Sequence, residues 1–200
     1  MPVFAAGEGG YAKRIMTNDL SLLLARVALG ASVASHGAQK GLGWFSGAGP
    51  EKSASFFEGL GFRPGHLFRN AAVASEIGGS LLTVLGLGGP IGPLTLLSTM
   101  IVAGRGAHAN NGFFAQQGGF ELTSAYGTAA LGLAASGPGR YSLDTALGWD
   151  ERLEKPWVLA LGIAGALVGA YAILGQRSPS PPPSNANGKP QAAEPAPAHT

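Results

Sequence analysis

Apolar residues gather in five long stretches, which short runs of glycine, proline and polar residues separate. The stretches cover about residues 20–36, 68–87, 94–108, 121–135 and 157–174. Each approaches the roughly 20 helical residues that are needed to cross a membrane. The third is too short up to Gly104, so it must continue through Arg105 and His108 to span. The pattern predicts an all-α integral membrane protein with five transmembrane helices.

The glycine, proline and polar runs between these stretches predict how the chain is organised. The run from Gly88 to Pro93 predicts a tight turn, so the second and third spans form an antiparallel hairpin. Because successive spans alternate in direction, the loops after the first and third spans emerge on the same face. The predicted segments are a polar N-terminal segment (1–19), a four-helix antiparallel bundle (20–147), a polar linker (148–156), a fifth transmembrane helix (157–174) and a disordered Pro/Ala-rich tail (175–200).

Composition narrows the possible functions. The chain is 46% hydrophobic and only 12% charged, and its 33 glycines suit transmembrane helices, in which glycine is frequent. The lack of cysteine excludes disulfides and thiolate-bound iron–sulfur clusters within this chain. A net charge of +2 without a basic run argues against nucleic acid as a partner. Lys13 and Arg14 precede the first span and favour a cytoplasmic N-terminus.

Four ionisable residues interrupt the apolar stretches: Arg26, Glu76, Arg105 and His108. Each charge placed in hydrocarbon costs about 2.5–3.5 kcal/mol, so such residues usually face a partner or a polar cavity. Glu76 and Arg105 both lie about 16 Å from the ends of the hairpin turn that joins their spans. The sequence therefore predicts a buried charge pair, Glu76 with Arg105 or with Arg26, which either serves a site or only fixes helix packing.

A second polar group is predicted where the first and third spans end. His36, Gln39 and Lys40 lie at one of these ends, and His108 and Asn111 at the other. Imidazole exchanges protons near neutral pH and also binds metals. The cofactor stays unknown at this point: a quinone headgroup is one candidate, and haem or a metal is less favoured because neither histidine belongs to a tight metal-ligand motif. Ordinary interfacial capping is the alternative. The predicted cofactor-binding residues are His36, Gln39, Glu76, His108 and Asn111, and no catalytic residue is assigned.

Several motifs in sequence order resemble the DoxX family of bacterial membrane proteins. They are His36–Lys40, Gly43–Phe45, Glu76–Gly79, His108–Phe114, Gly118–Glu121 and Gly137–Asp144. The resemblance implies a four-helix membrane bundle similar to the small subunit of a thiosulfate–quinone oxidoreductase, in a family with some members linked to redox membrane complexes. The fifth span and the tail lie outside the family's usual pattern.

These observations lead to a main hypothesis and two alternatives. The main one is a redox-associated subunit with a quinone-sized polar pocket. Its expected location is the bacterial cytoplasmic (inner) membrane. There it would contact lipid and belong to a membrane protein complex or a homo-oligomer. In this reading the chain would belong to a quinone-linked oxidoreductase. The first alternative is a non-catalytic accessory or assembly subunit that anchors such a complex. A small transporter or proton pathway is less well supported, because the fourth span has few polar residues.

Overall fold

The computed structural model describes the backbone of residues 7–178 and the side chains of residues 18–178. This part of the chain is helical and contains no strand, so the predicted all-α architecture is confirmed. The α-helices are α1 (Gly7–Leu42), α2 (Gly49–Gly59), α3 (Gly65–Leu85), α4 (Ile91–Ala103), α5 (Glu121–Ser136), α6 (Leu143–Leu147), α7 (Asp150–Leu153) and α8 (Pro156–Gly175). Most of the predicted tail, residues 179–200, lies outside the described residues.

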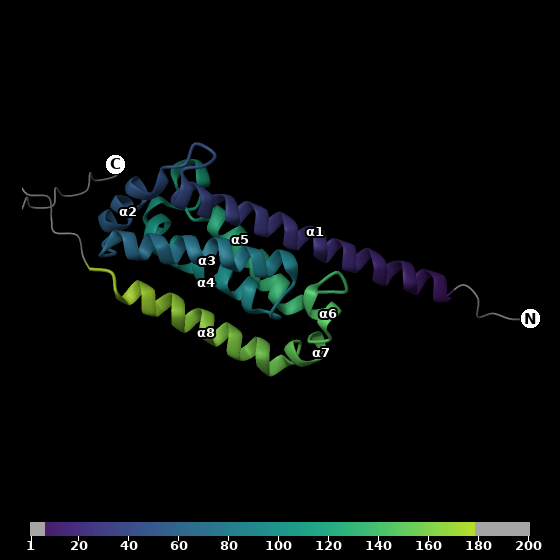
Figure 1. Ribbon diagram of the computed structural model, residues 1–200. Coiled ribbons are helices and arrows are strands. Elements are labelled where there is room, and N and C mark those ends of the chain that lie inside the picture. Colours follow the sequence, from purple (N-terminus) through teal and green to yellow (C-terminus); the bar gives the residue numbers. More distant parts are fainter. Residues whose placement is uncertain (1–6, 179–200) are drawn as a thin grey trace, which may run out of the picture.

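Four long helices form the bundle, and a fifth lies along it. Helix α3 packs between α1 and α4, α5 packs on α4, and α8 runs beside α4 (Figure 1). The short α2 covers one end of the bundle, whereas α6 and α7 cover the other (Figure 1). The N-terminal part of α1 extends beyond that second end. The buried apolar cluster of the bundle comprises Leu29, Val33, Leu96, Met100, Ala130 and Leu133.

Helix α1 is longer than the first predicted span. That span was expected to stop near His36 and to be followed by a loop, but the helix continues to Leu42. The first residue with a positive φ angle is Gly43, at φ 70°, and there the helix stops. The extra turn and a half therefore carries Gln39 and Lys40 on a helix rather than in a loop.

The α3–α4 hairpin is present, with its turn shifted by a few residues. Helix α3 ends at Gly86, whose left-handed conformation (φ 61°) suits glycine. Helix α4 begins at Ile91, so Pro93 lies in its first turn, where a proline is tolerated. Beyond α4 the helix passes into a π-helical turn, η1 (Gly104–His108), and a 3-10 turn, η2 (Ala109–Asn111). A second 3-10 turn, η3 (Ala115–Gln117), precedes α5.

Glycines on one face of α1 allow close packing against α3. A Cβ atom on Gly37 would lie 2.8 Å from the side chain of Ile77, and one on Gly41 would lie 3.0 Å from that of Val73. These two glycines are four residues apart and so lie on the same helix face. Small residues at this spacing let helix backbones approach each other in a membrane.

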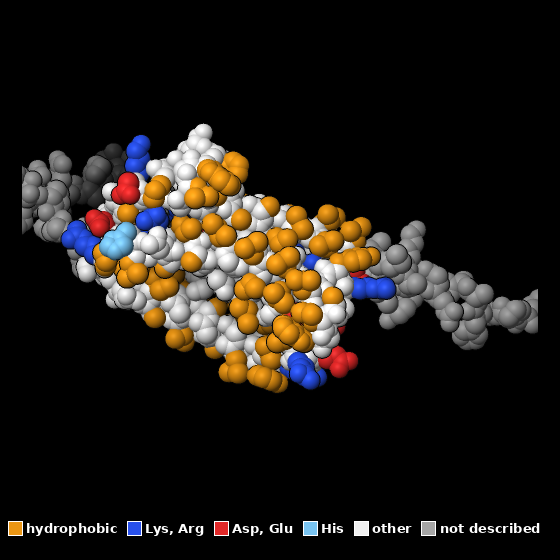
Figure 2. Space-filling model, in the orientation of Figure 1, with side chains coloured by type: hydrophobic (Ala, Val, Ile, Leu, Met, Phe, Trp, Pro, Cys, Tyr) orange, Lys and Arg blue, Asp and Glu red, His pale blue; other side chains and the backbone are white. Residues whose placement is uncertain are grey.

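Two helical segments of the described chain are long and apolar enough to cross a membrane. They are Asn18–Leu42 and Pro156–Gly175, which correspond to the first and fifth predicted spans. The other three spans remain predictions. Helices α4 and α5 have only 13 and 16 residues, and a full span takes about 20. Helix α3 has 21 residues, but Arg69 and Glu76 interrupt its apolar sequence. On the face drawn in Figure 2, charged side chains gather at the two ends of the molecule and hydrophobic side chains cover the region between.

Candidate functional site

Lys40 and Glu76 form an ion pair that joins α1 to α3. The Lys40 Nζ lies 2.7 and 2.8 Å from the two carboxylate oxygens of Glu76. The Glu76 side chain is only 5% exposed, and that of Lys40 is 28% exposed. Burying an unpaired charge is costly, so Lys40 compensates for the burial of this carboxylate. The extension of α1 past His36 places Lys40 where it can reach α3.

The arginines that were expected to pair with Glu76 lie elsewhere. Arg26 is buried, and its guanidinium donates hydrogen bonds to the carbonyl oxygens of Pro138 and Tyr141. Arg105 lies on η1 and is exposed. The expected pairing is therefore corrected to Lys40–Glu76. Equal depth along two helices does not establish that two side chains face each other.

Arg26 belongs to a polar cluster at the opposite end of the bundle, centred on Asp144. The Asp144 carboxylate is fully buried and accepts hydrogen bonds from the backbone N–H groups of Gly88 and Gly89, at 3.0 and 2.6 Å. The backbone N–H of Asp144 also donates to the carbonyl oxygen of Gly86. The segment from Pro138 to Asp144 thus ties the α3–α4 turn to α1, which gives this motif a structural role.

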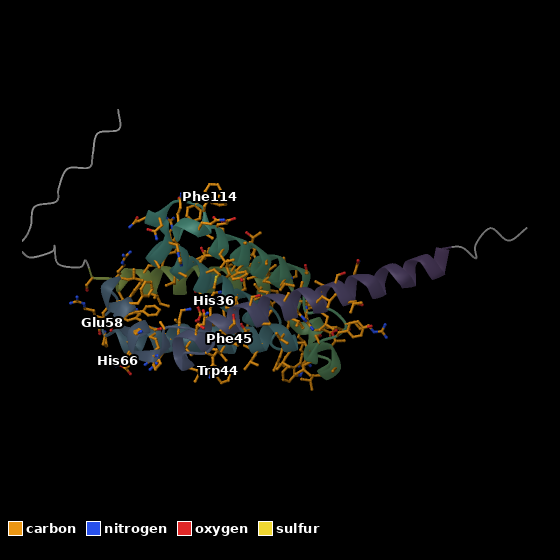
Figure 3. All side chains as sticks on the ribbon, turned by 90° about the horizontal axis from the view of Figure 1, so that it is seen from above. His36, Trp44, Phe45, Glu58, His66 and Phe114 are labelled. Atoms are coloured by element: carbon orange, nitrogen blue, oxygen red, sulfur yellow. The ribbon has the colours of Figure 1, made fainter. Side chains whose placement is uncertain are left out.

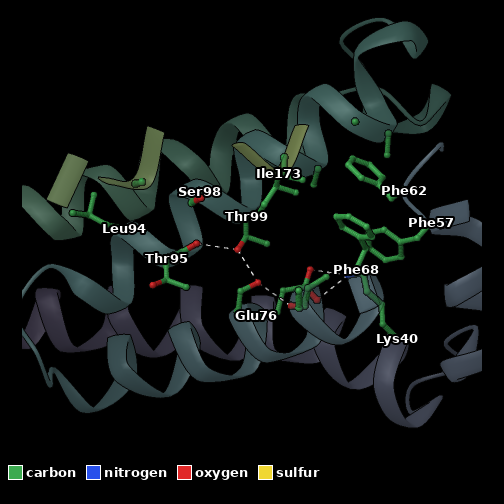
Figure 4. Close-up of a pocket in the computed structure, with 18 of the residues that line it drawn as sticks. Lys40, Phe57, Phe62, Phe68, Glu76, Leu94, Thr95, Ser98, Thr99 and Ile173 are labelled. Atoms are coloured by element: carbon green, nitrogen blue, oxygen red, sulfur yellow. Dashed lines mark hydrogen bonds and ion pairs between the residues drawn. The ribbon is translucent and has the colours of Figure 1, made fainter. Parts of the chain in front are cut away.

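The Lys40–Glu76 pair borders a cavity of about 480 Å³ between α3, α4 and α8. Cavities that bind small molecules usually measure about 300–1,000 Å³. Its polar lining includes Lys40, Glu76, Ser75, Thr99 and His108, with the Thr99 hydroxyl 3.0 Å from that of Ser75. Phe57, Phe62 and Phe68 lie close together beside Lys40, whereas Leu94 lies towards the opposite end of the cavity (Figure 4).

Two of the predicted site residues line a separate hollow. His36 and Gln39 border a space of about 580 Å³ beneath the loop that connects α1 to α2. Lys40, Phe56 and Phe57 border both spaces, so the two lie on either side of these residues. His36 lies at the same end of the molecule as Trp44, Phe45 and Phe114 (Figure 3). The loops after the first and third predicted spans therefore lie at one end, as their connectivity indicates.

His108 and Asn111 both bind the carbonyl oxygen of Gly118. The His108 Nδ1 lies 2.6 Å from this oxygen, and the Asn111 Nδ2 lies 3.2 Å from it. Because a carbonyl oxygen only accepts, Nδ1 must carry the hydrogen, and Nε2 of a neutral His108 is then an acceptor. His108 lines the larger cavity, but Asn111 is exposed and lines neither space.

The structure therefore divides the five predicted cofactor-binding residues. Glu76 and His108 share the larger cavity, His36 and Gln39 line the neighbouring hollow, and Asn111 supports the loop. No group of three or more potential metal ligands occurs within the described residues. The predicted set left out Lys40, although it lies one helical turn after His36 and forms the salt bridge to Glu76. Ser75 and Thr99 were missed because small hydroxyl residues are common in membrane helices and carry no charge.

Comparison with known proteins identifies the family of this region. The model of the family described as DoxX matches residues 21–109. The matched segment runs from the second quarter of α1 to the start of η2, and so includes Lys40, Glu76 and His108. Comparisons with curated proteins and with solved structures gave no match. Residues 21–109, somewhat under half of the chain, are therefore similar to the DoxX family of membrane proteins.

Proposed function

We propose that this protein is a redox-associated membrane subunit that binds the headgroup of a quinone in the cavity between α3, α4 and α8. The observation that carries the proposal is the buried Lys40–Glu76 ion pair at the wall of a cavity that is otherwise largely apolar. Ligand sites commonly combine an apolar lining with a few polar groups that orient the ligand. An ionic pair within a membrane helix bundle is also a common mark of a functional site.

The hydrogen-bonding capacity of this pair suits both the oxidised and the reduced form of such a headgroup. Two Lys40 N–H groups bind Glu76, which leaves the third for other acceptors. The Lys40 Nζ lies 3.5 Å from the carbonyl oxygen of His36, which is a weak contact. Lys40 can therefore donate to a quinone carbonyl. The Glu76 carboxylate has unused lone pairs, so it can accept from a quinol hydroxyl.

His108 supplies a group that can exchange protons with the headgroup. Its Nε2 is an acceptor when the ring is neutral, since Nδ1–H is bound to the carbonyl oxygen of Gly118. Nε2 can take a proton from a quinol hydroxyl, and the protonated ring can return a proton to a reduced quinone, which suits a quinone–quinol couple. In this proposal the chain binds the headgroup and exchanges protons with it, and a partner protein exchanges the electrons.

Equilibrium binding of a quinone to the purified protein in lipid nanodiscs tests this function. The Glu76→Gln/His108→Ala double variant should bind at least about tenfold more weakly, because hydrogen bonds to charged groups each contribute about 1.5–3 kcal/mol. The matched control is Glu51→Gln, which neutralises an exposed carboxylate in the first turn of α2. Unchanged quinone binding by a folded double variant would contradict the proposal.

A second function, the anchoring of a partner complex without chemistry, is favoured by the outer surface of α8. Leu161, Val168 and Tyr171 on this helix are 65%, 70% and 55% exposed. Such a surface can accept lipid or a transmembrane helix of another protein. Removal of residues 157–200 should then release a complex that co-purifies with the full chain, and an unchanged complex would count against this function.

A further inference from the structure

We infer that the ligand of the larger cavity enters sideways from the lipid bilayer, between α3 and α8, and leaves its apolar tail in the groove between α4 and α8. This inference rests on the proposed function and specifies its ligand as an amphiphilic quinone with a long chain. The Lys40–Glu76 pair receives the headgroup, and a lipid-facing opening admits the molecule.

The length of the cavity indicates a ligand larger than a headgroup. The lining follows one side of α4 and η1 from Ile91 to His108, which is about 25 Å at 1.5 Å per residue. The ionisable lining residues are Lys40, Glu76 and His108. Lys40 lies beside the Phe57–Phe68 cluster in Figure 4 and is paired with Glu76, and His108 follows Gly106, where a Cβ atom would lie 3.3 Å from Phe62. The half near the start of α4 is lined instead by apolar residues such as Leu94 and Val158. This division into a polar end and an apolar end matches an amphiphile with one headgroup and one chain.

The packing of α8 creates the opening. Among the bundle helices, α8 packs mainly against α4 and hardly contacts α3, so the cavity separates α8 from α3. Ala71 of α3 and Gly165 of α8 both line the cavity and are both exposed, so each helix contributes one exposed residue to the rim of this opening. The rim residues are small, so their side chains do not close it.

One glycine of α8 faces open space, whereas Gly162 packs tightly on α4, since a Cβ atom there would lie only 2.5 Å from the side chain of Leu94. Gly162, Gly165 and Gly169 recur at helical spacing and face the same side. A Cβ atom on Gly169 would lie 3.9 Å from the hydroxyl of Ser98, so this part of α8 faces α4. A Cβ atom on Gly165, in contrast, would meet no atom within 4 Å. The space beside Gly165 is therefore open to an apolar chain.

The polar end of the cavity is covered, which favours entry from the side. The backbone N–H of Ser178 donates to the carbonyl oxygen of Gly61 at 2.9 Å, and the Arg177 Nε donates to that of Leu60. The Arg177 guanidinium also lies 6.0 Å from the centre of the Phe62 ring. These contacts hold the end of α8 against the α2–α3 connection, whose residues Leu60 and Phe62 line the cavity.

The inference is tested by comparing two ligands that share a headgroup. Binding of a long-chain quinone and of its tail-less analogue is measured in nanodiscs with the wild type, Gly165→Phe and Gly132→Phe. Gly132 is the matched control because it is an exposed helical glycine whose Cβ would also meet nothing within 4 Å, but it lies on α5 outside the cavity lining. Gly165→Phe should weaken binding of the long-chain quinone by about tenfold or more, because the phenylalanine ring and the apolar tail of the quinone compete for one space. The tail-less analogue should bind all three proteins equally.

A thiol provides an independent readout, because the chain contains no cysteine. In the Gly165→Cys variant, saturating long-chain quinone should slow alkylation of the thiol by a membrane-permeant maleimide, and the tail-less analogue should not. Lateral entry would be overturned if Gly165→Phe weakened binding of both quinones equally. It would also be overturned if the variant weakened binding of neither quinone and the long-chain quinone did not protect the thiol. Either result would leave the headgroup site intact. Failure of the wild type to bind either quinone would instead overturn the proposed function, and this inference with it.

Discussion

The Asp144 Oδ2 lies 2.6 Å from the backbone N–H of Gly89, and the two residues belong to segments that are 55 positions apart in the chain. The same carboxylate binds Gly88, and Arg26 lies close enough to interact with it electrostatically. Asp144 thus joins the α3–α4 turn to the segment that follows α5.

Replacing Asp144 with alanine should strongly destabilise the fold. The change leaves two backbone N–H groups without their acceptor and removes the negative charge near the buried Arg26, a loss expected to cost about 3–5 kcal/mol. Thermal unfolding in detergent, followed by circular dichroism, measures the effect. Glu151→Ala, which removes an exposed carboxylate of α7, is the control. Equal melting temperatures for both variants would contradict the role assigned to Asp144.

Removing only one partner of the Lys40–Glu76 pair should cost more than removing both. Lys40→Met leaves Glu76 buried without its counter-charge, and breaking a buried pair this way typically costs about 3–5 kcal/mol. The Lys40→Met/Glu76→Leu double variant removes both charges and should recover much of that loss. A double-mutant cycle on the free energy of unfolding gives the coupling. Additive effects of the two single changes would show that the charges do not stabilise each other.

A larger residue at Gly37 should separate α1 from α3. A leucine there would overlap Ile77, since a Cβ atom alone would lie 2.8 Å from that side chain. Overpacking of this kind commonly costs about 1–3 kcal/mol. The control is Gly78→Leu on α3, where a Cβ atom would meet nothing within 4 Å. The melting temperature should fall for Gly37→Leu and change little for Gly78→Leu, and the reverse order would argue against close α1–α3 packing.

Glu154, which lies before α8, should make stability depend on pH. Partial burial raises the pKa of its carboxyl above the ordinary value, and Asp150 and then Asp144 add to this rise. The folded protein therefore binds this proton more tightly than the unfolded chain. The contribution of Glu154 to stability falls as pH rises from the ordinary carboxyl pKa through the raised one.

The Glu154→Gln variant isolates this effect. It should be slightly more stable than the wild type at neutral pH, and its advantage should disappear as the pH is lowered below the ordinary carboxyl pKa. Melting temperatures of both proteins between pH 4 and pH 8, at about 0.15 M salt to limit long-range charge effects, provide the measurement. An advantage that grows towards acidic pH would reverse the predicted sign.

The helices themselves could be predicted because their signals are local. The apolar runs and the turn residues from Gly88 to Pro93 indicated the positions of the α3–α4 hairpin and of α8 to within a few residues. The end of α1 was placed too early, since the polar residues His36, Gln39 and Lys40 resemble a helix end although they occupy its last turns. Polarity alone did not stop this helix, and the left-handed Gly43 did.

The pairing of charges could not be predicted from depth alone. Counting along the helices placed Glu76 level with Arg105, but the rotation of each helix about its axis decides which side chains meet. Lys40 meets Glu76 because the glycines of α1 bring the two helices together. The cavity could not be predicted either. It depends on the distance between α8 and α3, which no single segment of the sequence specifies.

The π-helical turn from Gly104 to His108 has a consequence for evolution. A π turn holds one residue more than the α-helical turn that it replaces. Deleting one residue within it would let α4 continue as a regular helix and would leave the chain beyond nearly in place, because the turn loses only its extra residue. A relative that lacks this single position could keep the whole bundle and still present a different side chain where His108 now lies. Insertions and deletions of one residue here could therefore diversify the chemistry of the cavity without remaking the fold.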